Sequence, residues 1–188
     1  MVLRSPLSFP EIPLYWSVRK HMEYDTPDRA YWIEYLEEAL GRLSSFQRYL
    51  VVQFKVDLAG IHGVDHWLRV YANGMRLSKT TGADEEVVKW FALLHDSCRR
   101  SNGGDPEHGP RAASIAWQHR AEIDLSCVEL DLLITAVSSH TMGRAAVADI
   151  TVQTCLDADR LDLVRIGAYT ARILTHRNGR ELTHLQSR

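Results

Sequence analysis

The chain has 188 residues, of which 45% are hydrophobic and 24% are charged, and its formal net charge is −2. This length accommodates one domain with a sizeable core and is short for two. The charge balance disfavours a nucleic-acid-binding protein that works through a broad basic surface. No apolar run is long enough for a membrane span, and the N-terminus lacks the apolar stretch of a signal peptide. We therefore expect a cytoplasmic protein.

The three cysteines, Cys98, Cys127 and Cys155, are widely spaced and form no CxxC pair. An odd number of separated cysteines does not make a disulfide framework, so a reducing compartment is expected. Cys98 is interpreted as a small buried hydrophobic residue.

The first part of the chain is predicted to be an extension of the body. Residues 1–25 hold three prolines and several scattered aromatic residues, which indicates an irregular arm. This arm either packs over the body or forms an oligomer contact, and a homodimer is plausible for that reason. Residues 1–50 are assigned to the arm and to helices that pack on the core, and residues 51–188 to the helical body of one structural domain.

Hydrophobic periodicity predicts about seven helices and no confident strand, hence an all-α fold. N-cap residues, prolines and acidic first turns indicate helix starts, and glycines indicate helix ends. The second helix signal runs into residues 51–56, which can also form a strand. The first predicted helix starts at Thr26-Pro27 and ends at Gly41, the second starts at Ser44 or Ser45, and the third is opened by residues 60–70 and ends at Gly82. Further helices are predicted to start at Asp84, at Pro110, at the Ser126–Glu129 capping box, whose helix ends at Gly143, and at Thr151. A short helix is predicted beyond Gly167, before a polar tail from about residue 177.

The pair His95-Asp96 stands out because it ends a helix that is apolar enough to be core. The residues before it place apolar side chains three or four positions apart, as on one face of a buried helix. Burial of an imidazole beside a carboxylate is tolerable if a cation or a hydrogen-bond partner meets both groups. The pair therefore indicates either a metal site or a capped helix end that points at solvent.

Other histidines and an aspartate lie in comparable positions. His66 shares a helical face with apolar residues, and His140 ends a stripe that repeats once per helical turn. Asp159 lies in an acidic piece of an otherwise core-like helix. Several such residues on separate helices can face one core, and nitrogen and carboxylate ligands suit a borderline-to-hard divalent metal.

This pattern resembles the HD superfamily of metal-dependent phosphohydrolases, whose signature is H…HD…D. The family's H-x-x-R-V context is matched by His66-Trp-Leu-Arg69-Val70, and its central pair by Leu94-His95-Asp96. Its A-D-x-L context is matched by Ala158-Asp159-Arg160-Leu161. The resemblance spans about residues 60–165 and implies a helical bundle of HD-domain type.

By this resemblance His66, His95, Asp96 and Asp159 would bind one divalent metal ion, for which Mn, Co, Ni, Mg, Zn and Fe are all candidates. Two imidazoles and two carboxylates leave open positions on an octahedral ion for a phosphate oxygen and for a water whose pKa the metal lowers. His62 lies one helical turn before His66 and competes as a ligand, although the Arg-Val that follows His66 favours the latter. Asp162 is interpreted as a salt-bridge partner or a solvated residue.

Some members of the superfamily bind a second metal through two more histidines between the HD pair and the last aspartate. His108 and His140 occupy this interval. They either hold a second metal, or His108 lines the pocket and His140 supports another ligand. Because His108 follows the HD pair after only a short loop, its reach to the site is an open question.

Charged residues near the pair suit phosphate chemistry, since guanidinium groups are preferred partners of phosphate oxygens. The candidate phosphate-binding residues are Arg99, Arg100 and Arg111. Asp105 and Glu107 are candidates for general acid–base work, and loop solvation or helix capping is the alternative for both.

Three functions follow from the sequence. The first is a hydrolase: a metal-dependent phosphohydrolase of a nucleotide or another small phosphorylated metabolite. The second is an oxygenase that resembles the superfamily's two-iron members, with His66, His95, Asp96, His108, His140 and Asp159 as ligands. The third is a non-catalytic module that binds a metal or a nucleotide.

Overall fold

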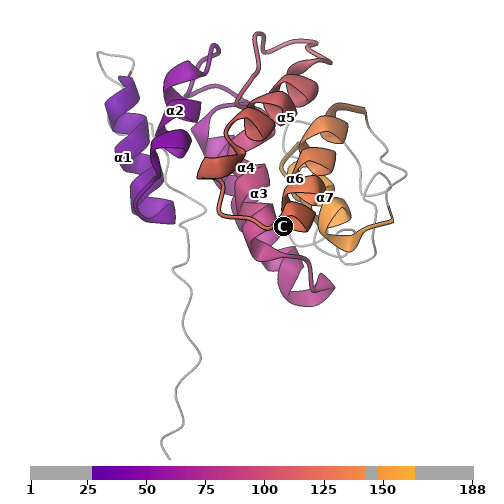
Figure 1. The fold of residues 1–188 in the computed structure, drawn as a ribbon. Helices are drawn as coiled ribbons and strands as arrows, with labels where there is room; N and C mark the ends of the chain where they lie inside the picture. The colour runs from indigo at the N-terminus through magenta and orange to yellow at the C-terminus, as the bar shows by residue number, and fades with distance from the viewer. Residues whose placement is uncertain (1–26, 143–147, 164–188) are drawn as a thin grey trace, which may run out of the picture.

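The computed structural model describes residues 27–142 and 148–163. Within these ranges the chain forms seven α-helices and two short 3₁₀ turns, with no strand (Figure 1), so the predicted all-α fold is confirmed. The elements are α1 (Arg29–Leu40), α2 (Ser45–Gln53), α3 (Val64–Thr81), α4 (Glu85–Leu94), α5 (His108–Gln118), η2 (Arg120–Glu122), α6 (Cys127–Ser139), η3 (His140–Met142) and α7 (Ile150–Leu163).

Helix α3 lies at the centre of the bundle. It packs along α7 and α4, while α6 contacts α4, α5 and α7. The pair α1 and α2 covers another side of the molecule, with α1 against α3 and α2 against α4 (Figure 1). This arrangement brings the start of α3, the end of α4, the start of α5, the end of α6 and the last turns of α7 within reach of one another.

Helix α3 illustrates why the sequence folds this way. Apolar and polar side chains lie on opposite faces of this helix. As predicted, one face buries His66, Val70, Asn73 and Leu77. Gly82 ends the helix with a left-handed backbone, φ +75°. This conformation favours glycine because a Cβ atom would crowd the following carbonyl.

Capping explains several helix starts. The side chains of Ser44 and Ser126 each accept a hydrogen bond from the third residue of their helix and complete a reciprocal capping box. The side chain of Asp84 caps α4 by accepting from the N–H of Val87, and two glutamates follow in the first turn. These three predicted starts are confirmed, as is the end of α1 at Gly41.

Other predicted boundaries are wrong by a few residues. Asp28 rather than Thr26 caps α1, because its side chain accepts from the N–H of Tyr31. The alternative strand at residues 51–56 does not form, since α2 continues to Gln53. The third and fifth helices begin at Val64 and His108, not in residues 60–63 or at Pro110.

Thr151 does not cap the last helix. It lies inside α7, and its hydroxyl accepts a hydrogen bond from the backbone N–H of Asp84. The carboxylate of Asp149 accepts from the N–H groups of Thr151 and Val152 instead. Thr151 thus ties α7 to the start of α4.

Some predictions lie outside the described residues: the arm at 1–25, the helix end at Gly143, the short helix beyond Gly167 and the polar tail. Among the helices that the structure describes, none combines the length and apolar character needed to cross a membrane.

Candidate metal centre

Five segments bring histidine and aspartate side chains to one place in the core. His66 lies in the first turn of α3, and His95 and Asp96 follow α4 directly. Asp159 comes from α7, His108 begins α5 and His140 follows α6. All six side chains are buried, although aspartates and histidines ordinarily prefer water.

The first group consists of His66, His95, Asp96 and Asp159. The Nε2 atoms of His66 and His95 lie 3.0 Å apart. From His66 Nε2, Asp96 Oδ2 and Asp159 Oδ1 are each 3.4 Å away. From His95 Nε2 the same two oxygens lie at 3.8 and 3.9 Å. Two nitrogens and two oxygens thus converge on one small volume.

The second group consists of Asp96, His108 and His140. The Nε2 atoms of His108 and His140 lie 2.8 Å apart. Asp96 Oδ1 lies 2.9 Å from His108 Nε2 and 3.6 Å from His140 Nε2. Asp96 therefore stands between the groups and turns one oxygen to each. The short loop before His108 does not prevent it from reaching the site.

The hydrogen bonds of the outer ring nitrogens indicate which histidine atoms carry lone pairs. Nδ1 of His95 lies 3.2 and 3.1 Å from the carbonyl oxygens of Phe91 and Ala92, and Nδ1 of His140 lies 2.7 Å from that of Val137. Nδ1 of His108 likewise contacts the carbonyl oxygen of Asp105. A carbonyl oxygen only accepts, so each of these Nδ1 atoms donates its proton and the neutral ring presents an unprotonated Nε2.

Two facing ring nitrogens repel each other when both carry lone pairs, and a proton or a metal cation between them removes the repulsion. Both imidazole pairs, His66–His95 and His108–His140, bring their Nε2 atoms this close together, and each has a carboxylate oxygen beside it. The geometry of these residues therefore fits a divalent metal ion. Nitrogen and oxygen donors of this kind suit Mn, Fe, Co, Ni or Zn.

Ionisation within the first group follows from its burial. Burial lowers the pKa of His95 to about 3, so its imidazole is neutral. Burial acts on His66 in the same direction, but Asp159, Asp162 and Asp96 accept hydrogen bonds from it and together raise its pKa well above the usual range. A proton on His66 thus satisfies both nitrogens of the pair, in the position where a metal ion would do the same.

The two carboxylates of the first group remain charged. Burial alone would raise the pKa of Asp96, yet the surrounding imidazoles of His95, His108, His140 and His62 hold it well below the usual value. Burial also opposes ionisation of Asp159, but a hydrogen bond from His66 lowers its pKa. Deprotonated carboxylates are the form that binds metals.

Comparisons with protein-family models, curated proteins and solved structures find no match to this chain.

Asp162 orients His66 from outside the group. Its Oδ2 lies 2.6 Å from His66 Nδ1, and its other oxygen accepts from Arg69 Nε at 2.5 Å. These contacts lower the pKa of Asp162 to about 2 against the opposing effect of burial. The predicted salt bridge of Asp162 is present. The sequence did not indicate its bond to His66, although Arg69 and Asp162 each follow a group residue by three positions, as neighbours on one helical face do.

His62 also reaches the site. Its Nδ1 lies 2.9 Å from Asp96 Oδ2, and together with His66 and Asp96 it forms a further set whose ligand atoms lie within 4.8 Å of one another. The indole of Trp67 donates to the His62 carbonyl and holds this turn against α3. His62 is thus either a hydrogen-bond partner of Asp96 or an additional ligand, the two roles that the sequence left open.

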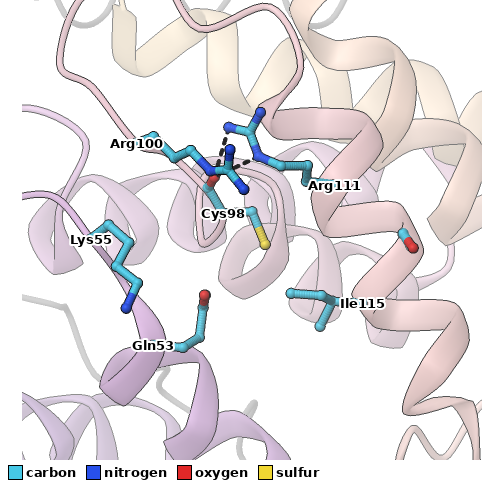
Figure 2. Close-up of a pocket in the computed structure, with 7 residues that line it drawn as sticks. Gln53, Lys55, Cys98, Arg100, Arg111 and Ile115 are labelled. Atoms are coloured by element: carbon cyan, nitrogen blue, oxygen red, sulfur yellow. Dashed lines mark hydrogen bonds between the residues drawn. The ribbon is translucent and has the colours of Figure 1, made fainter.

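The three candidate arginines take different directions. Arg99 Nε donates to Asp96 Oδ1 at 2.8 Å, and its Nη1 donates to the carbonyls of Ser101 and Gly103. Arg99 therefore braces Asp96 and the following loop. Arg111 donates to Asp105 and to the Cys98 carbonyl, and Arg100 lines a separate pocket beside it (Figure 2).

The two candidate acid–base residues differ in their surroundings. Asp105 Oδ2 accepts from Arg111 Nη2 at 2.6 Å and from the backbone N–H of Arg100, and the bond from Arg111 lowers its pKa. A carboxylate held in this way is a poor proton donor. Glu107 is exposed immediately before α5 and makes no side-chain cap hydrogen bond.

Proposed function

We propose that this protein is a metal-dependent phosphohydrolase of the HD type, with two neighbouring metal positions. The observation that carries the proposal is the position of Asp96, whose two oxygens each face a pair of inward-pointing imidazoles. A carboxylate between two ligand groups suits a two-metal centre. The resemblance of residues 60–165 to the H…HD…D signature adds independent support.

A metal pair of this kind would lower the pKa of a bound water and neutralise charge on a phosphate group. The chain's own residues supply the rest. The histidines present Nε2 lone pairs, because their Nδ1 atoms donate to carbonyls or to Asp162. Arg99 holds the Asp96 carboxylate, whereas Arg100 and Arg111 line a separate pocket. The substrate class is a small phosphorylated molecule such as a nucleotide.

The test combines metal analysis with assays of phosphate release. We expect one or two divalent metal ions per chain and release of phosphate from members of a panel of nucleotides and sugar phosphates. Asp96→Asn should abolish metal binding at both groups and reduce turnover by about 100-fold or more. Asp131→Asn, which changes an exposed aspartate on α6, is the matched control.

Two results would redirect the assignment. Metal binding without turnover of any phosphorylated compound would favour a non-catalytic metal or nucleotide module. Two irons per chain, with a mixed-valence electron paramagnetic resonance signal and oxygen-dependent turnover, would favour the oxygenase. The latter is a specific alternative because its six ligands, from His66 to Asp159, all lie in the two groups.

A further inference from the structure

A second pocket lies outside the two histidine groups. It has a volume of about 290 Å³ and lies between the end of α2, the turn after Asp96 and the exposed side of α5 (Figure 2). This volume is near the lower end of the range for small-molecule sites. None of its lining residues is a ligand candidate of the metal centre: Gln53, Lys55, Cys98, Arg100, Arg111, Ser114 and Ile115.

The pocket lining carries three basic side chains, and one of them, Arg111, is paired with Asp105. Lys55, Arg100 and Arg111 come from three different segments, and no acidic residue of the described part of the chain lines the pocket. Within residues 27–142 and 148–163, the ammonium of Lys55 and the guanidinium of Arg100 take part in no ion pair. Like charges repel when they line the same small space, and an anion between them offsets the repulsion.

Arg111 is held in place on one side of the pocket. Its Nη2 donates to Asp105 at 2.6 Å and to the Cys98 carbonyl at 3.0 Å (Figure 2), and its Nε donates to the same carbonyl. No bond from its Nη1 occurs among the described residues. A fixed guanidinium with a remaining donor is well suited to an oxyanion.

The wall of the pocket opposite Arg111 is also held against the turn that follows Asp96. The side-chain amide of Gln53 donates to the Ser97 carbonyl, which joins the end of α2 to the segment after Asp96. Asp105 accepts from the backbone N–H of Arg100 and so positions the Arg100 backbone. The side chains of Lys55 and Arg100 are exposed and can close on a ligand. Ser114 adds a hydroxyl, and Ile115 adds an apolar surface.

We propose that this pocket binds a phosphate group, either as inorganic phosphate or as part of a small phosphorylated molecule. A tetrahedral oxyanion matches two guanidinium groups and one ammonium better than a planar apolar ligand does. This inference does not depend on the proposed hydrolysis, because binding in the pocket requires no metal and no turnover.

The test is calorimetric titration of the full chain, as purified, with inorganic phosphate. We expect saturable binding that the double variant Lys55→Gln/Arg100→Gln weakens at least tenfold. Both side chains are exposed, so this variant should fold normally. Arg76→Gln, which removes an exposed arginine from the outer face of α3, should bind like the unchanged chain. A titration with adenosine monophosphate then separates the two sources of the group, since tighter binding than phosphate indicates a phosphorylated molecule.

Binding at the metal centre must be distinguished from binding in the pocket. Asp159→Asn weakens the first group without touching the pocket, so phosphate binding should survive in this variant. Should Asp159→Asn fail to fold, titration of the unchanged chain after chelation gives the same comparison. Absence of saturable binding, loss of binding with Asp159→Asn or chelation, or equal binding by the double variant would each overturn the pocket proposal. Loss of binding with Asp159→Asn or chelation would place phosphate at the metal centre instead, so a failure of the pocket proposal is distinguishable from a failure of the proposed hydrolysis.

Discussion

The backbone of Gly109 lies directly against the imidazole of His140. A Cβ atom at position 109 would lie 3.2 Å from two ring atoms of His140 and 2.6 Å from the carbonyl oxygen of Val137. That oxygen is also the acceptor of the His140 Nδ1 proton. The absence of a side chain at Gly109 therefore sets both the approach of α5 to α6 and the direction of one candidate ligand.

We expect Gly109→Ala to displace His140 while it leaves the first group intact. The added methyl group must move α5, the Val137 carbonyl or the ring, at a cost of about 1–3 kcal/mol in the free energy of unfolding. If the centre holds two metals, the metal content should fall from two ions per chain to one. Elemental analysis and thermal unfolding measure the two effects.

Gly104→Ala is the matched control, because a Cβ atom there meets nothing within 4 Å. It should leave both the metal content and the unfolding temperature unchanged. If Gly109→Ala retained two metals with unchanged affinity, His140 would not be a ligand in the way that the geometry indicates.

Asp162 should influence the metal centre without being a ligand. Its carboxylate accepts from His66 Nδ1, which leaves the lone pair on Nε2. In Asp162→Asn the amide can turn its NH₂ toward Nδ1, which favours the tautomer with the proton on Nε2 and blocks that atom. We expect metal affinity to fall about 10- to 100-fold, as for other residues that orient a ligand. Competition with a metal-binding dye measures this change.

The control for Asp162 is Arg69→Gln, which removes a different partner of the same carboxylate. Since His66 keeps its acceptor in this variant, its effect on affinity should be the smaller of the two. An equal loss in both variants would mean that Asp162 acts through packing of α3 on α7 rather than through the tautomer of His66.

Local rules predicted the helices well and their boundaries less well. Capping chemistry at Ser44, Asp84 and Ser126 acts within four residues, so the sequence contains the whole interaction. Thr151 satisfies the same local rule, yet its hydroxyl bonds to the N–H of Asp84, 67 positions away. A contact of that kind depends on how α7 packs on α4, and no local pattern contains it.

The candidate site shows the same difference between what local sequence predicts and what long-range packing decides. Spacing and sequence context alone single out the histidines and aspartates of both groups. The function of Arg99 as a brace for Asp96, and the inclusion of Lys55 in a positive pocket, were not predicted. Lys55 follows α2 in the segment 51–56, for which the sequence left helix and strand open, and only the packing of α2 on α4 brings it near Arg100 and Arg111.

The packing of α3 on α4 depends on Gly74. A Cβ atom there would overlap Val88 Cγ1 and touch the Cβ of Ala158 at 3.5 Å. Alanine favours helix by about 1 kcal/mol over glycine, but overpacking costs about 1–3 kcal/mol. We expect Gly74→Ala to lower the free energy of unfolding by about 1–2 kcal/mol in denaturant titration. A stabilised variant would show that Val88 rotates away and that the helices are less tightly packed than the contact indicates.

The three cysteines should differ in their reactivity toward a thiol reagent near pH 8. Burial raises the pKa of Cys98 and Cys155, and the thiolate is the reactive form, so little of it exists at these two positions. Both side chains are also buried, although Cys98 borders the pocket, whereas Cys127 is exposed at the start of α6. We expect one fast thiol per folded chain and three after unfolding. Cys127→Ser should abolish the fast reaction, and a fast thiol that persists in this variant would place Cys98 or Cys155 in contact with solvent.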